Sequence, residues 1–256
     1  MKKVLVTGAE GQLGKCLQKI AGDFPNLKCF FKGSTVLDIT DKEAINLAFE
    51  NTNVDYCINA AAYTNVEEAE RAPDKAYAVN AQGARNIAEA AKKYGVTLVH
   101  LSTDYVFDGE KEGAYSSSDV PNPINEYGRS KLAGERHIQE VLDKYYIIRT
   151  SWLYSEFGHN FYKTILNKAG QGESLFVTDT EVGCPTNANH LASYIMELLT
   201  HPKDYGIYHF TDGLAMSWFQ FAEAILKENG LEGKIELVKD NNYRTFARRP
   251  RNSVLK

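Results

Sequence analysis

Short apolar segments alternate with helical patterns through the first hundred residues, and this alternation constrains the fold more than any other feature of the sequence. The apolar segments are KKVLVT, LKCFF, VDYCIN and VTLVHLS, which have the length and composition of buried strands. The helical patterns between them are QLGKCLQKIA, KEAINLAFEN and DKAYAVNAQGARNIAEAAKKY. Strands that alternate with helices predict an α/β fold with a doubly wound parallel sheet, covered by helices on both faces.

Three glycines follow the first predicted strand in VLVTGAEGQLG, namely Gly8, Gly11 and Gly14. Glycine at these positions permits a tight turn, close approach of the backbone to a pyrophosphate, and close packing of the next helix on the strand. The N-terminus of that helix offers free N–H groups and the positive end of the helix dipole. The loop therefore predicts a dinucleotide site, although a glycine-rich turn without a ligand has the same composition.

The regular pattern loosens after Ser151. A fifth unit, with a helix from about Asn125 to Leu142 and the strand YYIIRTS, precedes this point. Beyond it, helices are predicted in FYKTILNKAG, NHLASYIMELLT and SWFQFAEAILKENG, and strands in SLFVTD and GIYHF. We expect a dinucleotide-binding domain of residues 1–150 plus about 187–212, and a smaller, partly interleaved substrate-binding region of about 151–186 plus 213–256.

The composition argues against several classes of function. A net charge of -4 provides no basic surface for nucleic acid or an anionic membrane. No apolar run is long enough to span a membrane, and the N-terminal run turns at Gly8 instead of continuing as a signal peptide, so we expect a cytoplasmic protein. The four cysteines show no CxxC spacing and indicate neither a disulfide framework nor a zinc site.

A tyrosine and a lysine stand four residues apart in the predicted helix of NPINEYGRSKLAGERH. At this spacing Tyr127 and Lys131 lie on one helix face, one turn apart. A free phenol has a pKa of about 10, and we expect the Lys131 ammonium to lower it, so that Tyr127 can give its proton to a carbonyl oxygen. Thr103 ends the strand VTLVHLS and is placed to hydrogen-bond the same oxygen. Alone the pair could be solvated; with the glycines and Thr103 it predicts a catalytic site.

These motifs resemble those of the extended short-chain dehydrogenase/reductases: the GxxGxxG loop, Asn59-Ala60-Ala61-Ala62, Ser102-Thr103-Asp104 and the YxxxK element. The runs NAAAYTNVEEAE, STDYVFDG, YGRSKLAGE, RTSWLY, HNF, GCPT and ARRPRNS narrow the resemblance to the dTDP-4-dehydrorhamnose reductase family, from end to end of the chain. The resemblance implies a Rossmann fold. It also implies reduction of the C4 keto group of a dTDP-linked 4-keto-6-deoxy sugar, dTDP-4-dehydro-L-rhamnose, to dTDP-L-rhamnose by hydride from NAD(P)H.

The resemblance also implies roles for single residues. In addition to acting on Tyr127, Lys131 would reach the nicotinamide ribose. The implied cofactor contacts are Gly8, Gly11, Gln12, Leu13, Gly14, Lys32, Asp38, Ile39, Ala60, Ala61, Ala62, Tyr127 and Lys131. The implied sugar pocket consists of Thr64, Val66, Asp104, Tyr105 and Trp152, with Trp152 as a flat wall for the ring. Read without the resemblance, Trp152 and Val66 could be core residues and Asp104 could cap a turn, while Asn80 has the character of a structural hydrogen-bonding residue.

Two features indicate how the phosphates are recognised. FARRPRNS places Arg249 between Arg248 and Arg251, and guanidinium groups bind phosphate oxygens bidentately, so we expect Arg249 to hold the substrate diphosphate. The alternative is a solvated basic tail. At the end of the second strand the sequence reads LKCFFKGST, with Lys32 and no acid before Asp38. A cation there accommodates a 2′-phosphate, which favours NADPH with NADH possible. Asp38 could equally cap a turn.

Several alternatives stay open at this point. The chain could act on another nucleotide sugar as a reductase or epimerase, or could be a non-catalytic relative that senses the cofactor; the presence of Thr103, Tyr127 and Lys131 argues against the second. Some relatives form a magnesium-linked dimer, but the corresponding positions here are Cys16 and Asn189, which are poor ligands for that ion. We therefore expect no metal site, and the oligomeric state stays open. Family members continue beyond the RPxNS element, so the chain is either cut short after Lys256 or lacks that tail.

Overall fold

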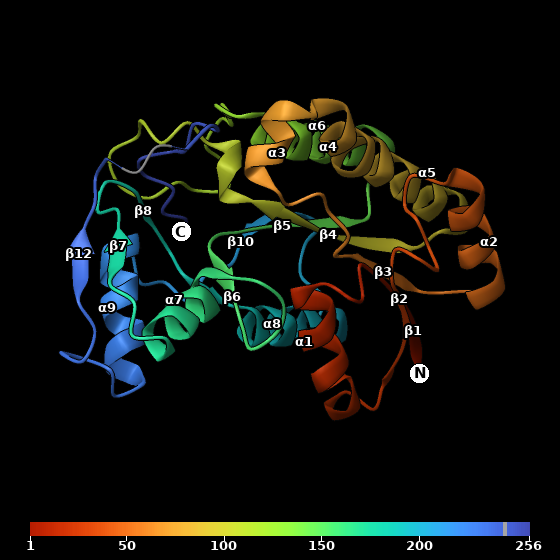
Figure 1. Cartoon of the computed structure of the whole chain (residues 1–256). Coiled ribbons are helices and arrows are strands. Elements are labelled where there is room, and N and C mark those ends of the chain that lie inside the picture. The colour runs from red at the N-terminus through yellow and green to blue at the C-terminus, as the bar shows by residue number, and fades with distance from the viewer. Residues whose placement is uncertain (243–244) are drawn as a thin grey trace.

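A six-stranded parallel sheet forms the centre of the computed structural model, which describes residues 1–242 and 245–256 (Figure 1). In spatial order the strands are β10 (Gly206–His209), β5 (Tyr145–Thr150), β4 (Thr97–Thr103), β3 (Tyr56–Asn59), β1 (Lys2–Thr7) and β2 (Leu27–Lys32). Each neighbouring pair is parallel. The predicted α/β fold with a doubly wound parallel sheet is therefore confirmed.

Helices cover both faces of this sheet (Figure 1). On one face lie α1 (Gln12–Ile20) and α8 (Ala188–Thr200), which pack on each other; on the other lie α2 (Lys42–Thr52), α5 (Ala84–Tyr94) and α6 (Glu126–Val141). Side chains alternate between the two faces along a strand. Val4 and Val6 therefore belong to the core between the sheet and helices α1 and α8, and Leu5 belongs to the core on the opposite face. All three are fully buried, which explains why the first predicted strand has no polar face.

The helical pattern predicted over residues 74–94 is not one regular helix. After α3 (Val66–Arg71) the chain forms α4 (Pro73–Tyr77), the π-helical segment η2 (Ala78–Gly83) and then α5. Asn80 in η2 is buried and binds the backbone N–H and carbonyl of Tyr63 at 2.8 and 3.0 Å, which confirms its expected structural role. A Cβ on Gly134 would lie 2.1 Å from the Asn80 carbonyl oxygen, so glycine allows α6 to pack closely against η2.

The smaller region contains short strands and two helices around its own apolar core. Its elements are β6 (Leu153–Tyr154), α7 (Phe161–Gly170), β7 (Leu175–Val177), β8 (Val182–Gly183), β9 (Thr186–Asn187), β11 (Met216–Ser217), α9 (Trp218–Glu228) and β12 (Leu237–Lys239). The strands pair as β11 with β8, β12 with β7, and β6 with β9. Helix α9 begins at a complete capping box between Ser217 and Gln220, which satisfies N–H groups at its N-terminus. Outside this region, the described part of the chain also contains the 3-10 turns η1 (Ala21–Asp23) and η3 (Asp104–Val106).

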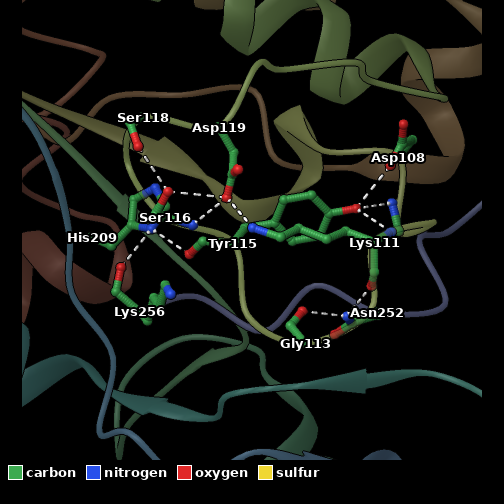
Figure 2. Close-up of polar contacts among 11 residues, drawn as sticks. Asp108, Lys111, Gly113, Tyr115, Ser116, Ser118, Asp119, His209, Asn252 and Lys256 are labelled. Atoms are coloured by element: carbon green, nitrogen blue, oxygen red, sulfur yellow. Dashed lines mark hydrogen bonds and ion pairs between the residues drawn. The ribbon is translucent and has the colours of Figure 1, made fainter.

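The C-terminal segment returns to the main sheet and is anchored there (Figure 2). Tyr115 and Leu255 form an isolated parallel bridge, and the Asn252 amide donates to the carbonyls of Lys111 and Gly113 at 2.7 Å. Nδ1 of His209, on β10, lies 3.1 Å from the Lys256 carbonyl. In the part of the chain that the structure describes, none of the helices combines the length and apolar character needed to cross a membrane.

Candidate active site

A cavity of about 670 Å³ lies at the carboxyl ends of β1, β3, β4 and β5, where open α/β sheets bind ligands. The predicted site residues that line it are Gly11, Gln12, Leu13, Ala60, Ala62, Thr64, Val66, Thr103, Asp104, Tyr105, Tyr127, Lys131 and Trp152. Residues at the N-terminus of α1 and residues from the start of the smaller region both line this cavity. The cavity therefore joins the two parts of the chain that the sequence assigned to cofactor and substrate.

The glycine loop brings the end of β1 against the end of β3. Gly8 has φ +66°, and a Cβ there would lie 2.5 Å from the Ala61 nitrogen. A Cβ on Gly14 would lie 2.4 Å from the Gly8 carbonyl oxygen. Gly11 is the N-cap of α1 and brings no side chain to the first N–H groups of the helix. The three glycines therefore form a cradle at a positive helix end, as a pyrophosphate requires.

The three predicted catalytic residues meet in the cavity. Thr103 ends β4 and is 5% exposed, while Lys131 on α6 is 2% exposed. The Asn125 side chain caps α6 by accepting from the Gly128 N–H at 2.7 Å, which fixes the helix start at Glu126, one residue before Tyr127. The Lys131 Nζ donates to the Leu101 carbonyl at 2.5 Å and is thereby held against β4. Helix α6 and strand β4 together position the group.

The electrostatics of the site differ from the sequence prediction. Burial raises the pKa of Tyr127 to about 12; a hydrogen bond from Thr103 acts against this rise and Asp104 adds to it. Burial lowers the pKa of Lys131 to about 8, and the Glu135 carboxylate opposes that change. The expected net lowering of the Tyr127 pKa is therefore wrong, because desolvation of the phenol outweighs any stabilisation of the phenolate by a charged neighbour. A phenol with a raised pKa keeps its proton at neutral pH and can donate it.

The residues predicted to bind the sugar include one acid, Asp104, and two aromatic residues, Tyr105 and Trp152. Burial raises the pKa of Asp104 to about 6, and its Oδ1 accepts from the Thr103 hydroxyl at 3.0 Å. The Trp152 ring stacks on Trp218, with centroids 3.5 Å apart and planes 7° from parallel. Trp152 has φ +47°, a strained value for a residue with a bulky side chain. The edge of the Tyr105 ring meets Tyr127 at 5.9 Å between centroids.

Other predicted residues lie outside the cavity lining, which includes none of Gly8, Gly14, Lys32, Asp38, Ile39, Ala61 and Arg249. Gly8, Gly14 and Ala61 form the contact between loops beneath it. Lys32 ends β2 and is partly exposed. The Asp38 side chain accepts from the Thr40 N–H and hydroxyl at 2.9 Å, which is the turn-capping role left open for it. Ile39 is buried against Gly83.

Arg249 lies beside a second cavity of about 360 Å³. Its NH2 donates to Glu67 at 2.8 Å, and the other oxygen of that carboxylate accepts the N–H groups of Phe246 and Ala247. Trp218 lines both cavities, so they adjoin at its ring. The C-terminal segment around Arg249 is packed, whereas Arg248 and Arg251 are exposed. The alternative of a solvated basic tail is therefore wrong for Arg249.

Sequence reasoning missed part of the cavity lining, which also includes Glu10, Leu101, Ser102, Thr150, Ser151, Leu153, Gly158, His159, Leu191 and Trp218. Thr150, Ser151 and Leu153 flank Trp152 at a strand end and could have been found from that position. Trp218 and Leu191 carry no local signal, because they reach the cavity only through the packing of α8 and α9.

Comparison with known proteins agrees with these observations. Residues 1–256 match the family described as the RmlD substrate binding domain. The dTDP-4-dehydrorhamnose reductase of Aggregatibacter actinomycetemcomitans is 39% identical, with 100% of this chain and 90% of the relative covered. The enzyme of that name from Escherichia coli K12 is 36% identical, with 98% and 88% covered. The crystal structure of the Bacillus anthracis dTDP-4-dehydrorhamnose reductase in complex with NADP superposes with a TM-score of 0.95 at 38% identity, covering 100% of this chain and 91% of that one. The chain therefore belongs to the RmlD substrate binding domain family, together with the dTDP-4-dehydrorhamnose reductases that its motifs predicted.

Proposed function

We propose that this chain reduces the C4 keto group of dTDP-4-dehydro-L-rhamnose to give dTDP-L-rhamnose, with NADPH favoured as the reductant and NADH possible. One observation carries the proposal: Thr103, Tyr127 and Lys131 share one cavity with the glycine cradle of α1 and the aromatic wall of Trp152. The family relationship and the names of the relatives support the choice of substrate.

The residues present fit the nicotinamide cofactor. A Cβ at Gly8 or Gly14 would clash with neighbouring backbone at 2.5 and 2.4 Å, so glycine at both positions allows the tight loop, and Gly11 at the start of α1 lines the cavity and leaves the helix N–H groups open to a pyrophosphate. Lys32 at the end of β2 supplies the cation that a 2′-phosphate needs. When bound there, NADPH supplies the hydride for the keto carbon.

Residues of the chain supply the proton and stabilise the negative charge that develops during the reduction. We assign Tyr127 as the general acid that donates its phenolic proton to the keto oxygen while the carbon is reduced. The Thr103 hydroxyl donates a hydrogen bond to the same oxygen as negative charge develops on it. The buried Lys131 ammonium stabilises the phenolate that forms when Tyr127 gives up its proton. We also assign Lys131 as a hydrogen-bond donor to the nicotinamide ribose.

The substrate extends from the cavity toward the second cavity. We assign Thr64, Val66, Asp104, Tyr105 and Trp152 to the sugar. Beyond the shared Trp218 ring, Arg249 faces a cavity of about 360 Å³ that Phe161 and Lys168 also line, and we assign this space to the diphosphate and the adjoining part of the nucleotide. Glu67 holds the guanidinium in place before the phosphates arrive.

The test is to incubate the purified chain with dTDP-4-keto-6-deoxy-L-lyxo-hexose and NADPH and to follow the loss of reduced-cofactor absorbance. We expect steady oxidation of NADPH and formation of dTDP-L-rhamnose. The Tyr127→Phe variant is the matched control, with turnover lower by about a hundredfold to ten-thousandfold and unchanged NADPH affinity. A flat trace from folded, NADPH-bound protein would remove this substrate and leave another nucleotide sugar, or a regulatory role, as the alternative.

A further inference from the structure

A buried ion pair lies directly behind the catalytic side chains. Glu135 on α6 is 0% exposed and Arg149 on β5 is 1% exposed, and neither residue lines the cavities described above. Burial of two opposite charges is costly unless hydrogen bonds satisfy them, so their place at the centre of the molecule needs an explanation.

The Glu135 carboxylate is held from two strands. Its Oε1 accepts from Arg149 Nε at 3.0 Å and from the Ser102 hydroxyl, and its Oε2 accepts from Arg149 NH2 at 2.6 Å. Ser102 and Arg149 are direct partners in the register of β4 and β5. The carboxylate is therefore fixed in one orientation by groups that the sheet has already aligned.

The same carboxylate is connected to the catalytic residues through two elements. On α6, Glu135 follows Lys131 by one turn, and Lys131 follows Tyr127 by one turn. On β4, Ser102 lies between Leu101, whose carbonyl accepts from Lys131, and Thr103. Glu135 thus joins helix and strand at the point where the ammonium bridges them.

The charges around Lys131 make Glu135 its counter-charge. His100 on β4 is neutral, because burial and then the Lys131 ammonium hold its pKa well below the usual range. Arg149 on β5 is already paired, and Asp104 lies next to Thr103. Of the elements packed on α6, η2 presents the neutral Asn80. Glu135 raises the pKa of Lys131 against the larger lowering by burial.

We propose that Glu135, locked by Ser102 and Arg149, is a positioning residue that keeps Lys131 in its ammonium form and holds it against β4. It touches neither cofactor nor substrate and acts through Lys131. This role rests on the proposed reductase function, in which the ammonium stabilises the Tyr127 phenolate.

The test compares the dependence of kcat on pH for wild type and four variants, between about pH 6.5 and 10 at saturating NADPH. Glu135→Gln removes the charge and keeps the shape. Glu135→Gln alone leaves the buried Arg149 guanidinium unpaired. The second variant, Glu135→Gln/Arg149→Met, therefore removes both charges of the ion pair. Glu140→Gln on the exposed face of α6 is the matched control, with the same change of charge on the same helix.

We expect the alkaline decline of kcat to move down by about one pH unit in Glu135→Gln, so that kcat falls about tenfold where wild type is still active, and to move down by less in Glu135→Gln/Arg149→Met, because that variant also loses the Arg149 cation. Glu140→Gln should keep the wild-type profile, and Glu135→Asp should restore most of it. A lower melting temperature with an unmoved alkaline decline would overturn the proposal, because it would make the pair structural only. Unfolding of both Glu135→Gln and Glu135→Gln/Arg149→Met would also overturn the proposal.

A second readout separates this proposal from the choice of substrate. The Lys131 side chain can be titrated by NMR with 13Cε-labelled lysine, its signal identified by its loss in Lys131→Arg. We expect the titration midpoint of Lys131 to fall in the variants without the Glu135 charge, whether or not the keto sugar is reduced. An unchanged midpoint would refute the role of Glu135 while leaving the proposed reaction intact.

Discussion

Gly183→Ala should damage the substrate side of the site through a single methyl group. Gly183 is buried in β8, and a Cβ there would lie 2.6 Å from Trp152 Cε2 and 2.7 Å from its Nε1. An ordinary contact begins at 3.4 Å, so the ring must move by 3.4 − 2.6 = 0.8 Å. The ring is already stacked on Trp218 at 3.5 Å, so it can move only by leaving the stack or by displacing its neighbour.

The expected effect on catalysis follows from that displacement. A misplacement of about 1 Å in a substrate-positioning group can cost about a hundredfold in rate, so we expect kcat/KM for the keto sugar to fall by about tenfold to a hundredfold. The extra methyl group should also lower the free energy of unfolding by about 1–3 kcal/mol. The Kd for NADPH should stay unchanged, because the atoms nearest the added methyl group all belong to Trp152 and none to the glycine loop after β1.

The assay is NADPH oxidation at varied sugar concentration, with cofactor affinity measured separately by NADPH fluorescence. Gly170→Ala is the matched control: this glycine ends α7 in the same region, and an added Cβ there has nothing within 4 Å. We expect that variant to match wild type. Wild-type kcat/KM in a folded Gly183→Ala protein would refute the inference that Trp152 positions the substrate.

Three further outcomes are expected. Trp152→Ala should raise KM for the sugar more than the Kd for NADPH; equal losses would identify the ring as a core residue. Lys32→Ala should narrow the preference in kcat/KM for NADPH over NADH, mainly by weakening NADPH, and an unchanged ratio would remove Lys32 from the 2′-phosphate site. Burial and then Arg149 lower the pKa of His209 to about 4, below its usual 6.5. The unfolded chain therefore takes up a proton first, and the free energy of unfolding should fall as pH decreases from about 6.5 to 4. His209→Asn should make that decline shallower in thermal melts.

The elements were predictable because each depends on a local pattern. The strand and helix segments quoted from the sequence correspond to β1 to β5, β7, β10 and the main helices, since burial on a sheet or helix face produces a period that the sequence displays. The meeting of Tyr127 with Lys131 was predictable for the same reason, because helical spacing places them on one face. The family followed from motifs that span the chain. The division into two domains stays a prediction.

Tertiary structure decided what depends on residues far apart in the chain. The stack of Trp152 on Trp218 joins two distant stretches of the smaller region, and the ion pair of Glu67 with Arg249 forms only when the C-terminal segment packs against α3. The direction of the shift in the Tyr127 pKa was predicted wrongly. Helical spacing identified the charged neighbour of the phenol, but it could not show the desolvation that outweighs that neighbour. Desolvation is the summed effect of every element packed around a group. The sequence by itself therefore determined the elements and the groups that local spacing and motifs bring together, whereas only the packed structure determined the contacts between distant residues and the solvent exclusion that shifts their pKa values.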